Sequence, residues 1–162
     1  MKKIKTTFLA VLALGIFTVS CTQKGEPSKQ GDLLSLEQIK ALENDQSMNG
    51  KLVTIEGYAG LCDNSMFVTK GKLNKMTIYS DGICNGEKLI NAQILLTKGN
   101  IPLSGDKPRN YASFPDDNKL TDESLTFMTD DYQEVKNEKL KFSGTIIYNG
   151  NNYTLDNVTI HK

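Results

Sequence analysis

The sequence has very little of the side-chain chemistry that most enzymes use. It contains a single histidine, His161, a single arginine, Arg109, and no tryptophan. A serine or cysteine nucleophile needs a base beside it, and the only histidine is the second-to-last residue of the chain. The sequence also lacks a glycine-rich phosphate loop and a zinc-ligand spacing. We therefore predict a protein that is not an enzyme and that uses no cofactor.

The sequence also lacks an excess of positive charge. It carries 19 basic and 19 acidic residues. Three lysines, Lys2, Lys3 and Lys5, lie in an N-terminal segment that we expect to be removed, which leaves 16 of the 19 basic residues against 19 acidic ones. Proteins that bind nucleic acid normally present a basic surface. The composition therefore argues against nucleic acid as a partner.

The N-terminus has the pattern of an exported protein. The basic start Met1–Lys5 precedes an apolar run from Phe8 to Phe17, which is shorter than the roughly 20 residues that a membrane-spanning helix needs. This pattern is typical of a secretory signal peptide. The following Thr18-Val-Ser-Cys21 resembles the bacterial lipobox, with threonine in place of the usual leucine. The resemblance implies that residues 1–20 are removed and that Cys21 is lipidated; the alternative is an ordinary secretory signal followed by a chance cysteine.

A lipid on Cys21 would place the protein on a membrane. Several acyl chains together hold a protein firmly on a bilayer, so we expect a lipid-anchored protein of the bacterial cell envelope. Thr22, where an inner-membrane lipoprotein would carry aspartate, favours the outer membrane. The next residues are polar and include glycine and proline, so we predict that residues 21–33 form a flexible tether. Residues 34–162 are long enough for one domain with its own core.

Two further cysteines, Cys62 and Cys84, remain if Cys21 is acylated. Outside the cytoplasm such a pair is typical of a disulfide. The bond would close a loop of about 22 residues and stabilise the fold by about 3 kcal/mol. The alternatives are a redox pair or half of a metal site, but neither a Cys-x-x-Cys spacing nor a nearby histidine supports them.

The clearest structural signal is a repeated strand pattern with a central glycine. In the stretch 51–60, apolar and polar residues alternate around Gly57, which indicates a strand with one buried face. The stretch 140–147 repeats the pattern around Gly144. Because glycine within a strand marks a bend or a close backbone contact, the two stretches predict the strongly bent strands of a small barrel.

The other elements are predicted from their periodicity and turn residues. Ser35 and Gln38 have the spacing of a capping box at the start of a helix, whose apolar side should cover one end of the barrel. The patterns predict a helix over 36–44, strands over 66–69, 76–79 and 89–96, an irregular loop over 99–121, and one short element within 124–135.

A hairpin is predicted at the C-terminal end of the chain. Its strands are 140–148 and 153–161, joined by Asn149–Asn152, in which Asn-Gly is a strong hairpin signal. The apolar positions of the last strand change from odd to even numbers after Leu155. This change predicts a β-bulge at Asp156–Asn157.

The order of these elements resembles the OB-fold, an all-β, five-stranded Greek-key barrel. More narrowly, the leading helix, the strand Val53-Thr-Ile-Glu-Gly-Tyr58 and the closing hairpin are similar to a bacterial OB-fold family of exported envelope proteins, grouped with tRNA-anticodon-like OB domains. The resemblance implies that strand 51–60 pairs with strand 140–148. It also implies that residues 81–138 are an insertion between the third and fourth strands. The family has no fixed functional residues to carry over.

The main functional prediction is a binding module. We expect it to recognise a small molecule, a glycan or a protein through the barrel face and the loop 99–121. Aromatic residues on OB-fold strands stack against ligands, which makes Tyr58, Phe67 and Tyr79 the candidate binding residues.

The alternative prediction is an envelope or stress-related protein that binds a cation of the Ca²⁺ type. It uses the acidic segment 116–134, with Asp130, Asp131 and Glu134 as candidate ligands. Calcium prefers several carboxylate and carbonyl oxygens on a loop. An acidic loop is, however, commonly just solvated.

Overall fold

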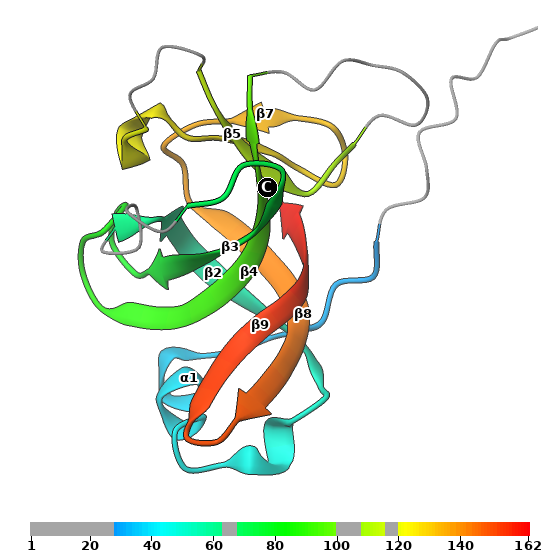
Figure 1. The fold of residues 1–162 in the computed structure, drawn as a ribbon. Coiled ribbons are helices and arrows are strands. Elements are labelled where there is room, and N and C mark those ends of the chain that lie inside the picture. The colour runs from blue at the N-terminus through cyan, green and yellow to red at the C-terminus, as the bar shows by residue number, and fades with distance from the viewer. Residues whose placement is uncertain (1–27, 63–67, 100–107, 116–119) are drawn as a thin grey trace, which may run out of the picture.

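The protein forms an all-β, OB-like barrel. A computed structural model describes residues 28–62, 68–99, 108–115 and 120–162. Five of its strands form a closed barrel (Figure 1). The strands are β2 (Leu52–Gly60), β3 (Lys72–Tyr79), β4 (Lys88–Lys98), β8 (Leu140–Asn149) and β9 (Asn152–His161). The order around the barrel is β2-β3-β4-β9-β8 and back to β2, with β4 and β9 parallel and the other pairs antiparallel. The predicted fold class is therefore confirmed.

The two strands with central glycines are neighbours, as predicted. Val53 lies opposite Gly144, and Gly57 lies opposite Leu140. A Cβ atom on Gly57 would lie 2.5 Å from the carbonyl oxygen of Tyr79. Glycine is therefore needed here because the backbone of β3 passes too close for any side chain.

The predicted bulge in β9 is also confirmed. Ser143 pairs with Thr159, but Thr145 pairs with Asp156. Asn157 and Val158 of β9 therefore lie opposite a single residue of β8, Gly144. The backbone of Asn157 has a φ of +52°. The extra residue turns the buried face from odd to even positions along β9, which accounts for the change in the sequence pattern.

The helix α1 (Leu36–Ala41) lies at one end of the barrel, beside the tip of the β8–β9 hairpin in Figure 1. The predicted capping box is present, but the helix is shorter than 36–44. It ends early because the N–H of Leu42 donates to the carbonyl of Ile39, which tightens the last turn. The Tyr148 hydroxyl donates to the carbonyl oxygens of Leu42 and Asp45, at 2.6 and 2.9 Å. This contact ties the end of the helix to β8; a short 3₁₀ helix, η1 (Gln46–Met48), follows.

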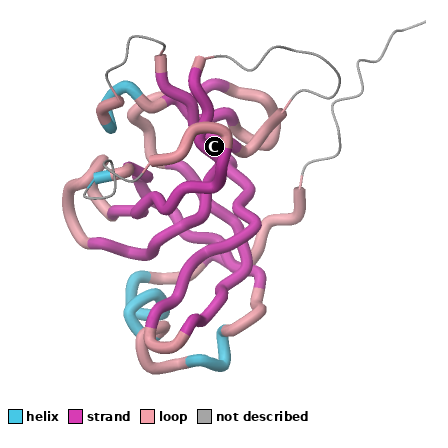
Figure 2. The backbone as a smooth tube through the Cα atoms, in the orientation of Figure 1, coloured by secondary structure: helices cyan, strands magenta, loops and turns pink. Residues whose placement is uncertain are grey.

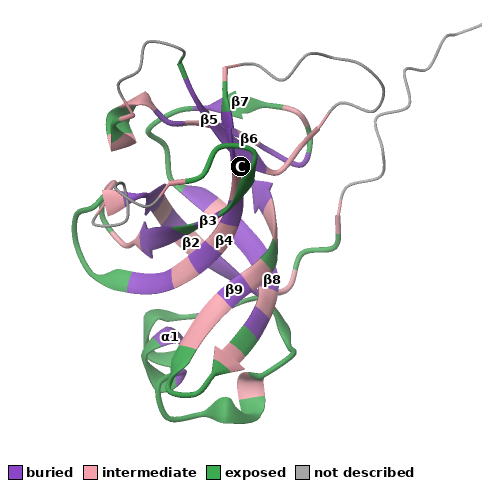
Figure 3. Cartoon of the chain, viewed as in Figure 1, coloured by how far each residue is buried: buried purple, intermediate pink, exposed green. Residues whose placement is uncertain are grey.

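The insertion between β4 and β8 covers the other end of the barrel (Figure 2). It contains β5 (Tyr111–Phe114), the 3₁₀ helix η3 (Asp122–Ser124), β6 (Thr126–Met128) and β7 (Glu134–Val135). Strand β5 pairs in parallel with the last residues of β4, and β6 and β7 extend the sheet. Buried apolar residues of this insertion join the barrel core, where Phe127 meets Phe142 edge to face at 6.2 Å. In Figure 3 the buried residues run through the barrel into the insertion.

The structure corrects two predictions for the middle of the chain. The loop 99–121 was predicted to be irregular, but residues 111–114 form β5 and all four are buried. The strand predicted at 66–69 is not formed at its described residues, Val68 and Thr69. There the Asn74 side chain takes the place of a strand partner. Its oxygen accepts a hydrogen bond from the N–H of Thr69, and its N–H₂ group donates one to the carbonyl of Thr69, each at 2.8 Å. The barrel meander is therefore β2-β3-β4, and the predicted strand 89–96 is confirmed within β4. Because β4 is a barrel strand, the predicted insertion begins after Lys98 and not at residue 81.

The ordered part of the domain begins before residue 34. Asp32 and Leu33 form β1, which pairs in parallel with β2. The backbone N–H and the hydroxyl of Ser28 both donate to Asp130. The prediction of a flexible tether up to residue 33 is therefore wrong for residues 28–33, because contacts distant in sequence hold this segment. Cys21 lies outside the described residues.

No helix in the described part of the chain combines the length and the apolar character needed to cross a bilayer.

Candidate functional site

A pocket of 620 Å³ lies at the α1 end of the barrel. It is formed where three segments meet: the turn after α1, the first residues of β4, and the β8–β9 turn with the start of β9. Its lining residues are Glu43, Asn44, Lys88, Leu89, Ile90, Asn91, Asn151, Asn152 and Tyr153. The volume lies within the range of about 300–1,000 Å³ that is typical of small-molecule sites. This pocket is the candidate functional site.

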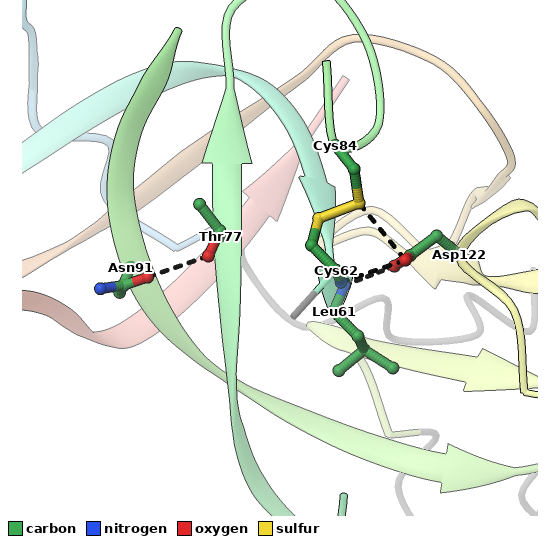
Figure 4. The surroundings of a disulfide bond; sticks show 6 residues. All are labelled: Leu61, Cys62, Thr77, Cys84, Asn91 and Asp122. Atoms are coloured by element: carbon green, nitrogen blue, oxygen red, sulfur yellow. Dashed lines mark hydrogen bonds between the residues drawn. A yellow bond between two sulfur atoms is a disulfide. The ribbon is translucent and has the colours of Figure 1, made fainter. Parts of the chain in front are cut away.

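Asparagines make up four of the nine residues that line the pocket. The side chains of Asn44, Asn151 and Asn152 make no hydrogen bond to any residue that the structure describes. Asn91 is held in place, because the Thr77 hydroxyl donates to its side-chain oxygen at 2.9 Å (Figure 4). That bond leaves the N–H₂ group of Asn91 without a partner among the described groups. The amides can therefore bind a ligand without breaking protein contacts.

Tyr153 supplies the aromatic surface of the pocket. Its ring lies 5.7 Å from that of Tyr148, at an interplanar angle of 40°. Burial, the negative charge of Glu43 and the neighbouring Tyr148 raise the pKa of Tyr153. The hydroxyl therefore stays protonated at neutral pH and can both donate and accept a hydrogen bond.

The charges at the pocket balance. Glu43 and Lys88 contribute one charge of each sign to its lining. Beside it, Lys40 and Glu87 form an exposed ion pair at 3.1 Å, on the rim of a smaller, adjoining pocket of 320 Å³. The two charged residues among the described lining therefore sum to zero, which favours neither an anion nor a cation.

Two of the three predicted aromatic residues lie near this site. Tyr58 on β2 and Tyr79 on β3 are direct cross-strand partners and are half-buried. Tyr79 in turn lies opposite Lys88, which lines the pocket. The third candidate, Phe67, lies outside the described residues. The structure thus brings two of the three predicted residues together.

The asparagines of the pocket were not among the predicted binding residues. The segment Asn149–Asn152 was interpreted as a turn signal, which is correct, since β8 and β9 meet there. Nothing in the sequence showed that this turn faces Asn44 and Asn91, because the three segments meet only in the folded barrel.

The first acidic candidate, Asp130, is a buried structural residue. Its carboxylate accepts hydrogen bonds from Ser28 and from the Asn110 amide at 2.8 Å, and the Nε of Arg109 lies 3.4 Å away. Burial acts to raise the pKa of Asp130, but these hydrogen bonds and the charge of Arg109 outweigh it, so the pKa is lowered. Hydrogen-bond donors and the guanidinium of Arg109 therefore compensate the negative charge of the Asp130 carboxylate.

The other two acidic candidates have different surroundings. The Asp131 carboxylate accepts from the hydroxyl of Thr129 and the amide of Gln133. Glu134 is exposed on β7. These three acidic residues do not form a group of closely spaced metal-ligating atoms among the described side chains.

The predicted disulfide joins Cys62 to Cys84, with a Cα–Cα distance of 5.6 Å. Figure 4 shows Asp122 beside it. The Asp122 carboxylate accepts from the backbone N–H groups of Leu61 and Cys62, and one oxygen lies 3.3 Å from the Cys84 sulfur. The three side chains have their ligating atoms within 4.8 Å of one another. A metal would need the thiolate form of the cysteines, which the disulfide removes.

His161 is buried at the end of β9. It lines a cavity of 380 Å³ together with Asp130 and Asp131, and its Nε2 lies 3.0 Å from the Thr159 hydroxyl. Burial lowers the pKa of His161, against the opposing effect of the two aspartates. The Thr159 hydroxyl also bonds the carbonyl of Ser143 at 3.4 Å, so it is engaged within the sheet.

Comparisons of the chain with protein-family models, with curated proteins and with solved structures gave no match.

Proposed function

We propose that the protein is a non-enzymatic binding module of the bacterial cell envelope, anchored by a lipid on Cys21. Its partner is a small molecule, a glycan or a protein segment. The observation that supports this proposal best is the pocket at the α1 end of the barrel, which four asparagines and Tyr153 help to line. We assign recognition to this pocket, with the Tyr58–Tyr79 face next to it as a further contact surface.

The N-terminal sequence supports the location. The basic start, the apolar run and the lipobox-like sequence ending at Cys21 are those of an exported lipoprotein. The Cys62–Cys84 disulfide fits an oxidising compartment outside the cytoplasm. Outer-membrane residence follows from Thr22 as the second residue after processing.

Two measurements test this proposal. Cells fed radioactive palmitate should label the wild-type protein and should fail to label a Cys21→Ser variant, which should leave the membrane fraction. A thermal-shift screen of the purified lipoprotein against small molecules and glycans should find a stabilising ligand, since binding to the folded state alone raises the melting temperature. Palmitate on the Cys21→Ser variant would contradict the anchor, and a screen without any pocket-dependent ligand would contradict the site.

The cation-binding alternative has less support. Both oxygens of Asp130 already accept hydrogen bonds from protein groups. A rise in melting temperature with added Ca²⁺ would support cation binding, provided that the rise disappears in an Asp130→Asn, Asp131→Asn variant.

A further inference from the structure

We propose that the pocket binds a neutral carbohydrate, one or two sugar units of a glycan. The proposal rests on the proposed function, since it takes this pocket as the recognition site. It goes further by naming the ligand class.

The amides of the pocket provide the first argument. Asn44 follows α1, Asn91 is on β4, and Asn151 and Asn152 come from the β8–β9 turn. Each carboxamide offers a donor and an acceptor side by side, the geometry that matches two neighbouring hydroxyl groups of a sugar ring. Among the groups that the structure describes, only the Asn91 oxygen already has a partner, Thr77. A sugar can therefore bind these amides without breaking hydrogen bonds between the described residues.

Tyr153 provides the second argument. A sugar has an apolar face of C–H groups as well as its hydroxyls, and an aromatic ring with a polar tip can contact both. The ring of Tyr153 packs against the ring of Tyr148. Tyr148 is itself fixed, because its hydroxyl is bonded to the carbonyls of Leu42 and Asp45. The aromatic surface is thus held in place before the ligand arrives, which lowers the entropy cost of binding.

The charge of the pocket provides the third argument. Recognition of phosphate or carboxylate groups normally uses arginine or a cluster of cations. The only arginine, Arg109, lies elsewhere and contacts Asp130. Lys88 is balanced by Glu43, whose carboxylate can accept a charge-assisted hydrogen bond from a sugar hydroxyl. These features select a neutral, hydroxyl-rich ligand.

The test is ligand-detected saturation-transfer NMR on the full-length mature lipoprotein, in a detergent without a sugar headgroup. The probes are glucose, N-acetylglucosamine, maltose and diacetylchitobiose, each at up to about 10 mM, with AMP and glutamate as charged comparators. At least one neutral sugar should receive saturation from the wild type. AMP and glutamate should receive none.

Four variants locate the binding. The double variant Asn44→Ala, Asn151→Ala removes two amides that have no partner in the described structure, so it should fold normally and bind the sugar at least about ten-fold more weakly. Gln93→Ala is the matched control: it removes a half-buried amide of the same strand as Asn91 but outside the pocket. Tyr153→Phe should retain most binding, and Tyr153→Leu should lose it. Melting curves identify any variant that fails to fold.

Three results would overturn the carbohydrate proposal. One is a wild type that saturates none of the neutral sugars. Another is sugar binding that the double variant leaves unchanged. The third is pocket-dependent binding of AMP or glutamate alone, which would keep the binding module but reject carbohydrate. The proposed function itself fails separately, if a broad ligand screen also finds nothing that depends on the pocket.

Discussion

Asp130 connects three parts of the fold, and its substitution should lower the free energy of unfolding. Its side chain is 2% exposed and joins Ser28 of the N-terminal segment to Asn110 and Arg109, which precede β5. Its own backbone N–H donates to the carbonyl of Ile160 on β9 at 2.7 Å. The Asp130→Asn change keeps the shape but replaces one acceptor oxygen by a donor, which would face the donors of its neighbours.

We expect Asp130→Asn to lower the free energy of unfolding by about 3 kcal/mol. Removing one partner of a buried ion pair typically costs roughly 3–5 kcal/mol. The lower end applies because Arg109 keeps other contacts, including the Tyr132 ring 5.9 Å away. Urea unfolding followed by circular dichroism measures the change, and Asp32→Asn, at an exposed position on β1, is the control. If Asp130→Asn lowers the free energy of unfolding no more than the control does, Asp130 does not stabilise the fold in this way.

The same residue should make stability depend on pH. The pKa of Asp130 is lower in the folded protein than its ordinary value, which is about 3.9 in an unfolded chain. Its contribution is therefore fully present above that value and is lost as the pH falls through the lower pKa of the folded state. The wild type should lose more stability than Asp130→Asn between about pH 5 and the acid limit of folding. Parallel curves for the two proteins would contradict this assignment.

Three further changes test other parts of the structure. Replacing Cys62 and Cys84 together by alanine should lower the free energy of unfolding by about 3 kcal/mol, because the disulfide closes a loop with a sequence separation of 22; an unchanged urea midpoint would refute this. Asp122→Asn should speed reduction of the disulfide by dithiothreitol, since the carboxylate repels thiolates beside Cys84, and an unchanged rate of thiol release would show that the charge is irrelevant. Gly57→Ala should destabilise the barrel by about 1–3 kcal/mol because its Cβ would collide with backbone, whereas Gly82→Ala, with nearest contacts of 3.6 Å, should be tolerated.

Local patterns were enough to predict the barrel strands that alternate clearly. The glycines at 57 and 144 marked the close approaches, and the change of parity after Leu155 located the bulge at Asn157. Each signal lies within a few residues of the feature that it predicts. The pairing of β2 with β8 is different, because it joins residues far apart in the sequence and was implied only by the resemblance to the OB-fold.

The insertion and the pocket depend on contacts between distant residues. Strand β5 lies between Pro108 and Pro115, which indicated a loop, but it is stabilised by pairing with β4 and by burial of all four of its residues. The prolines bound the strand and do not interrupt it. Likewise Ser28 is ordered by Asp130, 102 residues away. No local pattern could have revealed either contact.

The most direct test of the binding site is photo-crosslinking in living cells. A benzophenone amino acid is placed at Asn152 in the pocket and, separately, at Lys75, which is exposed on β3 outside the pocket. Mass spectrometry then detects any adduct of the protein. We predict an adduct at position 152 and none at position 75. An adduct at position 75 alone, or none at either position, would contradict the assignment of recognition to this pocket.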